Sequence, residues 1–238
     1  MTILTSFAIV ILAALVHASF QLSVSVLTLL SGHSFGAQKS HYRTLRLTTS
    51  FVAGVGVMTL LLLAFLTFGV SFVFQTDASR LIWTLVCGLL IGVGLAVWFF
   101  YYRKEKGTTL WIPRSFARYL TSRSKSTKDK VEAFSLGLTS VIGELLFIIA
   151  PLVVSALVIN QLPTEWTPLA IFTYAVVSLI TLISVWVFIS SGHRLSTIQK
   201  WREDNKRFLQ FSAGSALVVL GFFVYVWKVV SDSAGFLS

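Results

Sequence analysis

The chain has 238 residues, of which 55% are hydrophobic and 12% are charged, and its mean hydropathy is +0.83. This composition is typical of a protein with several membrane spans and excludes an ordinary soluble domain. The net charge of +10 indicates the anionic lipids of a bilayer as a partner, because the basic residues stand beside predicted membrane helices, and we expect no nucleic acid partner.

Apolar runs long enough to cross a bilayer recur along the whole chain. A membrane-spanning helix needs about 20 predominantly apolar residues. The predicted spans are residues 3–31, 47–74, 81–102, 133–160, 166–191 and 208–228. We therefore predict an all-α membrane protein with six transmembrane helices, which form a single transmembrane domain over residues 1–238.

Span one carries a polar stripe. His17 and Gln21 are spaced i, i+4 and lie on one side of a helix, and Ser25 continues the line. Lipid cannot satisfy an imidazole or a carboxamide, so this face must turn toward protein or water. We interpret His17, Gln21 and Ser25 as part of a binding site. The alternative is hydrogen bonding that only packs the bundle, at about 0.6 kcal/mol per contact.

The sequence Ser-Gly-His ends spans one and five, with His33 and His193 as the two histidines. The simpler interpretation is a shared helix stop, because glycine ends a helix and a basic residue complements its negative end. The alternative is a pH-sensitive cytoplasmic gate in which His33 faces His193.

Span three contains Cys87, the only cysteine, and a run of small residues, Gly88, Gly92 and Gly94. A lone cysteine allows no disulfide or CxxC pair within the chain, so redox chemistry is disfavoured and no cofactor is expected. The glycines predict close helix contacts within or between subunits, which leaves a homo-oligomer open as a partner.

The connection after span three divides the chain near its middle. Residues 103–131 are predicted to form a basic cytoplasmic loop, in which Thr121–Lys130 is mobile. The loop separates a first three-helix half, residues 1–102, from a second, residues 132–238. Because each half has an odd number of spans, related halves would be inverted in the membrane, an arrangement typical of transporters.

Span four carries Glu144, the only charged residue between Ala133 and Ile159. A carboxyl group at bilayer depth costs at least ~2.5 kcal/mol, so it calls for a partner, water or a function. Pro151 removes a backbone hydrogen bond and predicts a kink or break near Glu144. Setting Gln21 opposite Glu144 aligns the two halves weakly and places both residues near the membrane midplane, where inverted-repeat transporters bind substrate.

The basic residues give the orientation. All but Arg80 and Lys228 of the 19 basic residues lie in the connections after spans one, three and five. The positive-inside rule places those connections in the cytoplasm and both termini outside. Short connections and a single cysteine suit a multi-pass protein of a bacterial inner membrane.

These features together resemble the lysine exporter superfamily. The resemblance is one of architecture and rests on six spans, outside termini and a basic loop between the halves. It also rests on a fourth span with a small-residue start, a mid-helix polar residue and Pro151. That superfamily includes amino-acid exporters, metal exporters and thiol-disulfide electron carriers. The resemblance implies a six-span exporter fold.

The predicted function is a secondary transporter, an exporter of a small solute or ion that binds between spans one and four. Glu144 would carry the coupling or binding charge, with His17 as its proton or ligand partner and Gln21 as an orienting hydrogen bonder. A tight metal site needs three or four ligands, and only His17 and Glu144 qualify, so no metal is expected.

A second hypothesis comes from another class of protein. The chain would be a non-transporting membrane anchor or assembly protein that holds a partner through its basic cytoplasmic loops. An enzyme is not expected, because the sequence offers no second acid or nucleophile near Glu144.

Single cysteines test the predicted orientation. With Cys87 replaced by alanine, we expect Lys125→Cys to be protected from a membrane-impermeant maleimide added to intact cells, and Glu165→Cys to be labelled. Labelling of Lys125→Cys without lysis would show that the topology is reversed.

Overall fold

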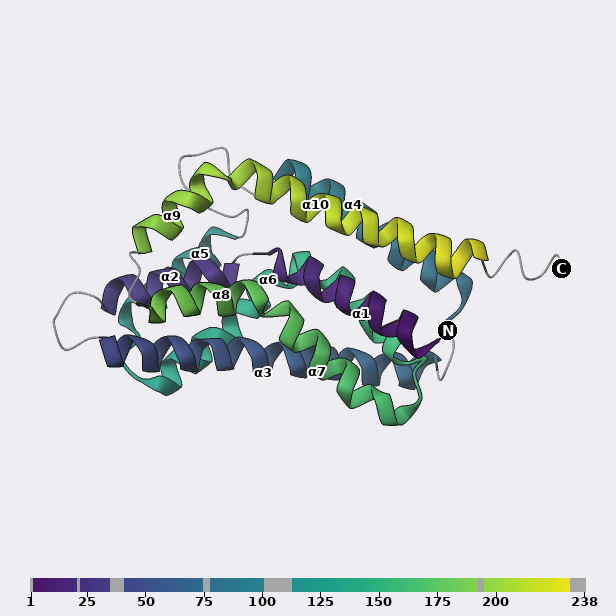
Figure 1. Ribbon diagram of the computed structural model, residues 1–238, viewed down its shortest axis with the longest axis horizontal. Helices are drawn as coiled ribbons and strands as arrows, with labels where there is room; N and C mark the ends of the chain where they lie inside the picture. The colour runs from purple at the N-terminus through teal and green to yellow at the C-terminus, as the bar shows by residue number, and fades with distance from the viewer. Residues whose placement is uncertain are drawn as a thin grey trace.

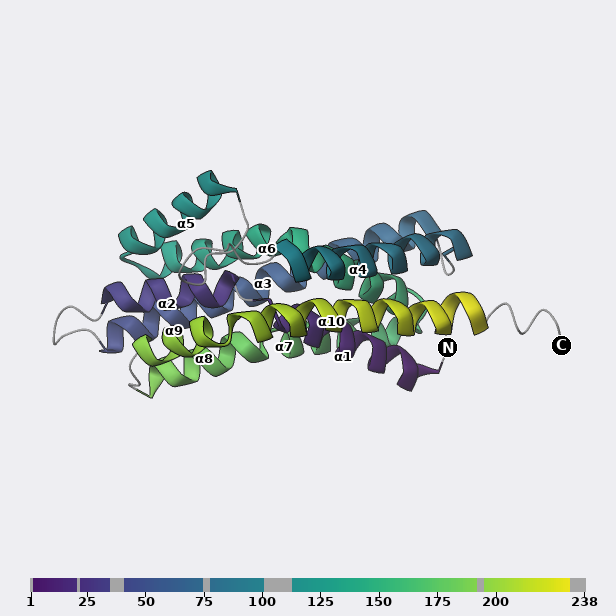
Figure 2. The ribbon, with the colours of Figure 1, turned by 90° about the horizontal axis from the view of Figure 1, so that it is seen from above.

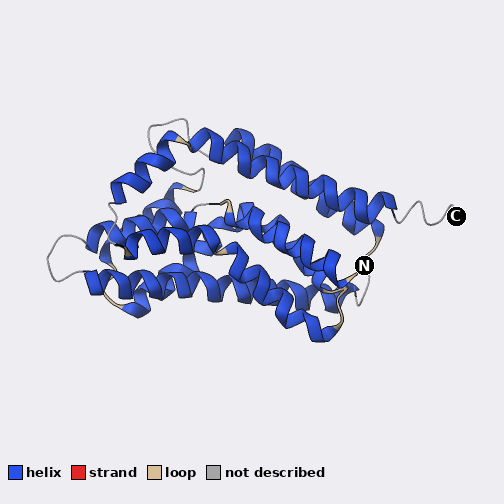
Figure 3. Cartoon of the chain, in the orientation of Figure 1, coloured by secondary structure: helices blue, strands red, loops and turns tan. Residues whose placement is uncertain are grey.

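The computed structural model describes residues 2–20, 22–34, 41–74, 78–100, 113–191 and 195–231, and within these ranges every regular element is a helix (Figures 1 and 3). The helices are α1 (Ile3–Ala18), α2 (Leu22–Ser34), α3 (His41–Phe74), α4 (Arg80–Phe100), α5 (Arg114–Ser126), α6 (Lys130–Ile159), η1 (Thr164–Trp166), α7 (Thr167–Ser178), α8 (Ile180–Ser190), α9 (Leu195–Asp204), α10 (Lys206–Tyr225) and η2 (Val226–Val230). The prediction of an all-α chain is confirmed for this part of the protein.

Four helices are long and apolar enough to cross a membrane: α3, α4, α6, and α10 continued by η2. Two further candidates are bent pairs. α1 and α2 meet at 46°, and the segment of η1 and α7 meets α8 at 50°. The described residues therefore contain four membrane-spanning candidates, or six if each bent pair is one span.

The helices run along the long axis of the molecule (Figures 1 and 2). α3 packs along α6, and α4 packs along α10. The α4–α10 pair lies beside α1 and α6, whereas α2, α5, α8 and α9 gather in the other half of the molecule. The start of α1 and the end of α10 lie at the same end, opposite the start of α3.

Glycines allow the closest helix contacts. A Cβ on Gly54 of α3 would strike the backbone of Phe134, and one on Gly137 of α6 would strike the backbone of Phe51. Gly94 of α4 faces Gly214 of α10 in the same way, where an added Cβ would lie 2.8 Å from a carbonyl oxygen. Each pair lets two backbones approach within a distance that larger residues prevent.

The predicted loop between the halves requires a correction. Of residues 103–131, those from 113 onward are described, and most of them form α5 and the start of α6 rather than a mobile loop. Phe116, Leu120 and Ser124 recur at helical spacing, and Leu120 and Ser124 are buried. The Phe116 ring packs against Gly143 of α6. The segment was predicted to be a loop because it is basic and rich in serine, but it forms a short amphipathic helix.

The glycine contacts predict a contrast between two valine variants. We expect Gly137→Val to destabilise the protein by about 1–3 kcal/mol, because the added atoms meet the backbone of α3. Gly92→Val is the matched control, since no heavy atom lies within 4 Å of its added Cβ. The melting temperatures of both variants in detergent give the comparison. Equal values would contradict the close contact between α3 and α6.

Candidate functional site

Span one is interrupted just after its polar stripe begins. α1 ends at Ala18, where the Ser19 hydroxyl donates a 2.6 Å hydrogen bond back to the carbonyl of Val16. Such side-chain bonds compete with the backbone ladder and favour a helix end. α2 then begins at Leu22, so its first N–H groups have no carbonyl partner within the helix.

Glu144 of α6 accepts hydrogen bonds from the start of α2. The backbone N–H of Ser23 donates a 2.7 Å hydrogen bond to Oε1 of Glu144, and the N–H of Leu22 and the Ser23 hydroxyl also interact with the carboxyl group. Glu144 is only 4% exposed. A carboxylate at the positive end of a helix is favoured by the helix dipole, and hydrogen bonds to charged groups contribute about 1.5–3 kcal/mol. Glu144 therefore joins α6 to the break in span one.

Ser140 supports the same contact one helical turn before Glu144. Its hydroxyl lies 3.2 Å from that of Ser23 and also donates to the carbonyl of Gly137 at 2.8 Å. Both serines are buried. α6 thus holds the start of α2 through two side chains on one face, since residues spaced i, i+4 stand one above the other.

A second break faces the first. α7 ends at Ser178 and α8 begins at Ile180, with Leu179 between them. The Ser178 hydroxyl donates 2.9 Å to the carbonyl of Ala175, the same kind of local bond that Ser19 makes in span one. Neither proline nor glycine occupies this break.

His17 connects the two broken spans. Its Nδ1 lies 3.1 Å from the hydroxyl of Tyr174, and both side chains are buried. The rings are 5.7 Å apart and tilted by 52°. Because a neutral imidazole has one donor and one acceptor nitrogen, the tautomer decides which group donates. The bond ties the end of α1 to α7 about one turn before α7 ends.

A cavity of about 20 Å³ lies where these groups converge. Its polar walls are His17, Ser23, Glu144, Ser178 and Thr181. That volume holds about one water molecule. The structure thus brings Glu144 and His17 to one small polar cavity between the broken spans, and it gives His17 a hydrogen-bond partner, Tyr174, that the sequence did not indicate.

Ser25 lies on α2, and its part in a binding site stays a prediction. Its hydroxyl accepts a 2.9 Å hydrogen bond from Nη2 of Arg202 on α9. Arg202 was assigned to a cytoplasmic connection, yet it is only 3% exposed. Its position four residues after Ile198 is the sequence signal, because it places Arg202 on the apolar stripe of an amphipathic helix.

Pro151 does not interrupt span four. α6 is assigned as one helix from Lys130 to Ile159, and Pro151 is buried seven residues after Glu144. The breaks occur in spans one and five instead. Neighbouring helices can support a helix around a proline, which is how membrane helices tolerate it.

The structure gives little on three other predicted residues, Gln21, His33 and His193. Gln21 and His193 lie outside the described residues, and His33 lies in the last turn of α2. The pH-sensitive gate therefore stays a prediction. Among the described residues, no three His, Cys, Asp or Glu side chains form a group that would hold a metal ion.

In comparisons with known proteins, no family model, no curated protein and no solved structure matches this chain. The resemblance to the lysine exporter superfamily stays a prediction from architecture.

Tyr174 provides a test of the site's geometry. We expect Tyr174→Phe to lower the free energy of unfolding by about 1–3 kcal/mol, because it leaves a buried ring nitrogen of His17 without its partner. Tyr225→Phe, at a side chain 37% exposed, is the control. Denaturant titration gives the loss of unfolding free energy in Tyr174→Phe and in Tyr225→Phe. The same titration of His17→Leu, alone and combined with Tyr174→Phe, gives the coupling energy between the two side chains. Equal losses in Tyr174→Phe and Tyr225→Phe would argue against the His17–Tyr174 bond.

Proposed function

We propose that the protein is a secondary transporter, an exporter of a small solute or ion in a bacterial inner membrane. Three basic segments face the cytoplasm and both termini face outside. The observation that carries the proposal is the meeting of two bent spans at a buried carboxyl group. Discontinuous helices at membrane depth occur where protein or a cavity satisfies their free backbone groups, and transporters place substrate and ion sites there.

Glu144 is the coupling residue of this proposal. As a carboxylate it accepts the backbone hydrogen bond that holds the start of α2. With a proton bound or a cation at its side, it accepts that bond more weakly, because charge-assisted bonds are about twice as strong as neutral ones. Loss of negative charge at Glu144 therefore loosens the start of α2, and gain of negative charge tightens it.

The half-helices α2 and α8 would respond together. They contact one another and lie in the same half of the molecule, beyond the two breaks (Figures 1 and 2). His17 and Tyr174 link the other two half-helices, α1 and α7. The bond between His17 and Tyr174 can hold α1 and α7 together while α2 and α8 move, and the bond from Ser23 to Glu144 can hold α2 while α1 and α7 move. Alternating access requires two such positions.

The inverted relation of the halves is part of the proposal. Equivalent residues near a twofold axis lie close together, and Glu144 bonds to Ser23, two residues from its proposed counterpart Gln21. The pattern of breaks departs from this relation, because spans one and five are bent whereas spans one and four would be equivalent.

The anchor hypothesis has one observation in its favour. Arg118, Arg123 and Lys125 are exposed on α5. Deletion within α5 would disturb its packing, so reversing these three charges is the better test. An anchor would lose its partner, whereas a transporter would keep its flux.

Replacement of Glu144 tests the transport proposal. In liposomes with an internal pH indicator, we expect the wild type to move protons when one member of a panel of amino acids, metal ions and organic ions is added. Glu144→Gln is expected to fold, but its proton flux should be lower by a factor of about ten or more, equivalent to ~1.4 kcal/mol in the activation free energy. The amide oxygen still accepts from Ser23, so the fold does not depend on the charge.

Glu132→Gln is the matched control. Glu132 is a half-buried glutamate at the start of the same helix, and its Oε2 accepts a 2.7 Å bond from the backbone N–H of Lys128. It should transport as the wild type does. Wild-type flux in Glu144→Gln would end the proposal.

A further inference from the structure

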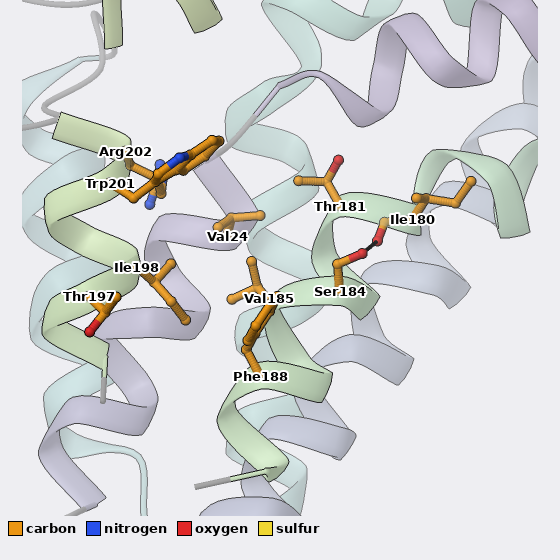
Figure 4. Close-up of a pocket in the computed structure, with 10 residues that line it drawn as sticks. All are labelled: Val24, Ile180, Thr181, Ser184, Val185, Phe188, Thr197, Ile198, Trp201 and Arg202. Carbon is orange, nitrogen blue, oxygen red and sulfur yellow. Dashed lines mark hydrogen bonds between the residues drawn. The ribbon is translucent and has the colours of Figure 1, made fainter. Parts of the chain in front are cut away.

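A larger pocket lies between α8 and α9, with α2 at its base (Figure 4). Its volume is about 530 Å³, within the range of small-molecule sites. Val24, Ile180, Val185, Phe188, Ile198 and Trp201 form most of its wall. This lining suits a hydrocarbon group rather than a hydrated ion, because apolar surface gains by leaving water.

Arg202 gives the pocket its charge. Among the described residues that line the pocket, it is the only ionisable one, and Thr181, Ser184 and Thr197 are the other polar ones. Its Nη2 donates to Ser25 at 2.9 Å, which fixes the guanidinium at the α2 side of the pocket. A guanidinium presents five donors in a planar fork that matches a carboxylate or phosphate.

The pocket adjoins the Glu144 cavity. Val24 and Thr181 line both spaces, so a single layer of side chains separates them. Glu144 lines only the small cavity, and Arg202 lines only the pocket. A ligand in the pocket therefore meets a positive charge before it meets the negative one.

We propose that the pocket between α8 and α9 binds a single-chain amphiphilic anion, with its hydrocarbon chain against Phe188 and Ile198 and its anionic group at Arg202. Binding itself follows from the pocket alone. That the bound anion is also the exported solute rests on the transport function proposed above, with Val24 and Thr181 as the barrier between the pocket and the Glu144 cavity.

The experiment uses Trp201 as the reporter, because it lines the pocket. The full chain is placed in nanodiscs of phosphatidylcholine and titrated with bromododecanoate, whose bromine quenches nearby indole fluorescence. Saturable quenching is expected in the wild type. Its absence in Trp201→Phe assigns the signal to Trp201 among the seven tryptophans.

Three variants locate the ligand. Arg202→Gln should weaken binding about tenfold or more, as loss of a charged partner of the head group predicts, and Arg202→Lys should restore part of it. Because Arg202 also holds α9 to α2, Ser184→Phe provides a second test that leaves this bond in place. It fills the pocket and should abolish the quenching.

Four outcomes would overturn the inference. They are no saturable quenching in the wild type, unchanged quenching in Ser184→Phe, equal affinity for bromododecanol, and equal affinity for the trimethylammonium analogue. Bromododecyl phosphate distinguishes a phosphate from a carboxylate head group, and tighter binding of either one supports an anion site.

The result is separable from the transport proposal. Binding of the probe together with wild-type flux in Glu144→Gln would retain the pocket and remove the transport role of Glu144. Loss of flux in Glu144→Gln without binding of the probe would do the reverse.

Discussion

The hydrogen bond from the Ser23 backbone to Glu144 is the interaction on which the arrangement of this protein depends. A helix that starts in an apolar interior leaves its first N–H groups without partners, and a buried carboxylate lacks counter-charge. Each satisfies the other here. Without Glu144, α2 would start unpaired in the bundle, and without the start of α2, Glu144 would be a buried charge with little support.

This contact also explains why polar groups gather at one level of the bundle. His17 and Tyr174 join the ends of α1 and α7, Ser140 joins Ser23, and Arg202 joins Ser25 from the outer side. The glycine contacts between α3 and α6 hold the scaffold against which these broken helices pack. In the proposed transporter, the long helices α3 and α6 would be the frame and the two bent spans the moving parts.

Much of the architecture was predictable from the sequence. Apolar runs near 20 residues locate the spans, and the lone charge in span four marks Glu144, because bilayer thickness and charge burial are strong constraints. The same reasoning placed a site between spans one and four, and α6 does contact the start of α2 there, through the Ser23 backbone, which the sequence did not indicate. A side-chain stripe can be seen in a sequence, whereas a free backbone N–H cannot.

Other features depend on contacts that no local pattern records. The break at Leu179 has no proline or glycine to mark it, and the proline that is present, Pro151, lies in an unbroken helix. α5 and α9 are short and basic, so their composition resembles that of loops, although Leu120 of α5 and Arg202 of α9 are buried. Tertiary packing decides these cases, since short helices gain most of their stability from it.

The most direct measurement is amide hydrogen exchange at the start of α2. The account predicts that Glu144→Ala accelerates exchange at residues 22–25, because the Ser23 N–H loses its acceptor, while exchange in α10 stays unchanged. Glu132→Ala, which removes a half-buried carboxyl group at the start of α6, should affect only that helix end. Wild-type exchange at residues 22–25 in Glu144→Ala would contradict the central contact and the coupling role built on it.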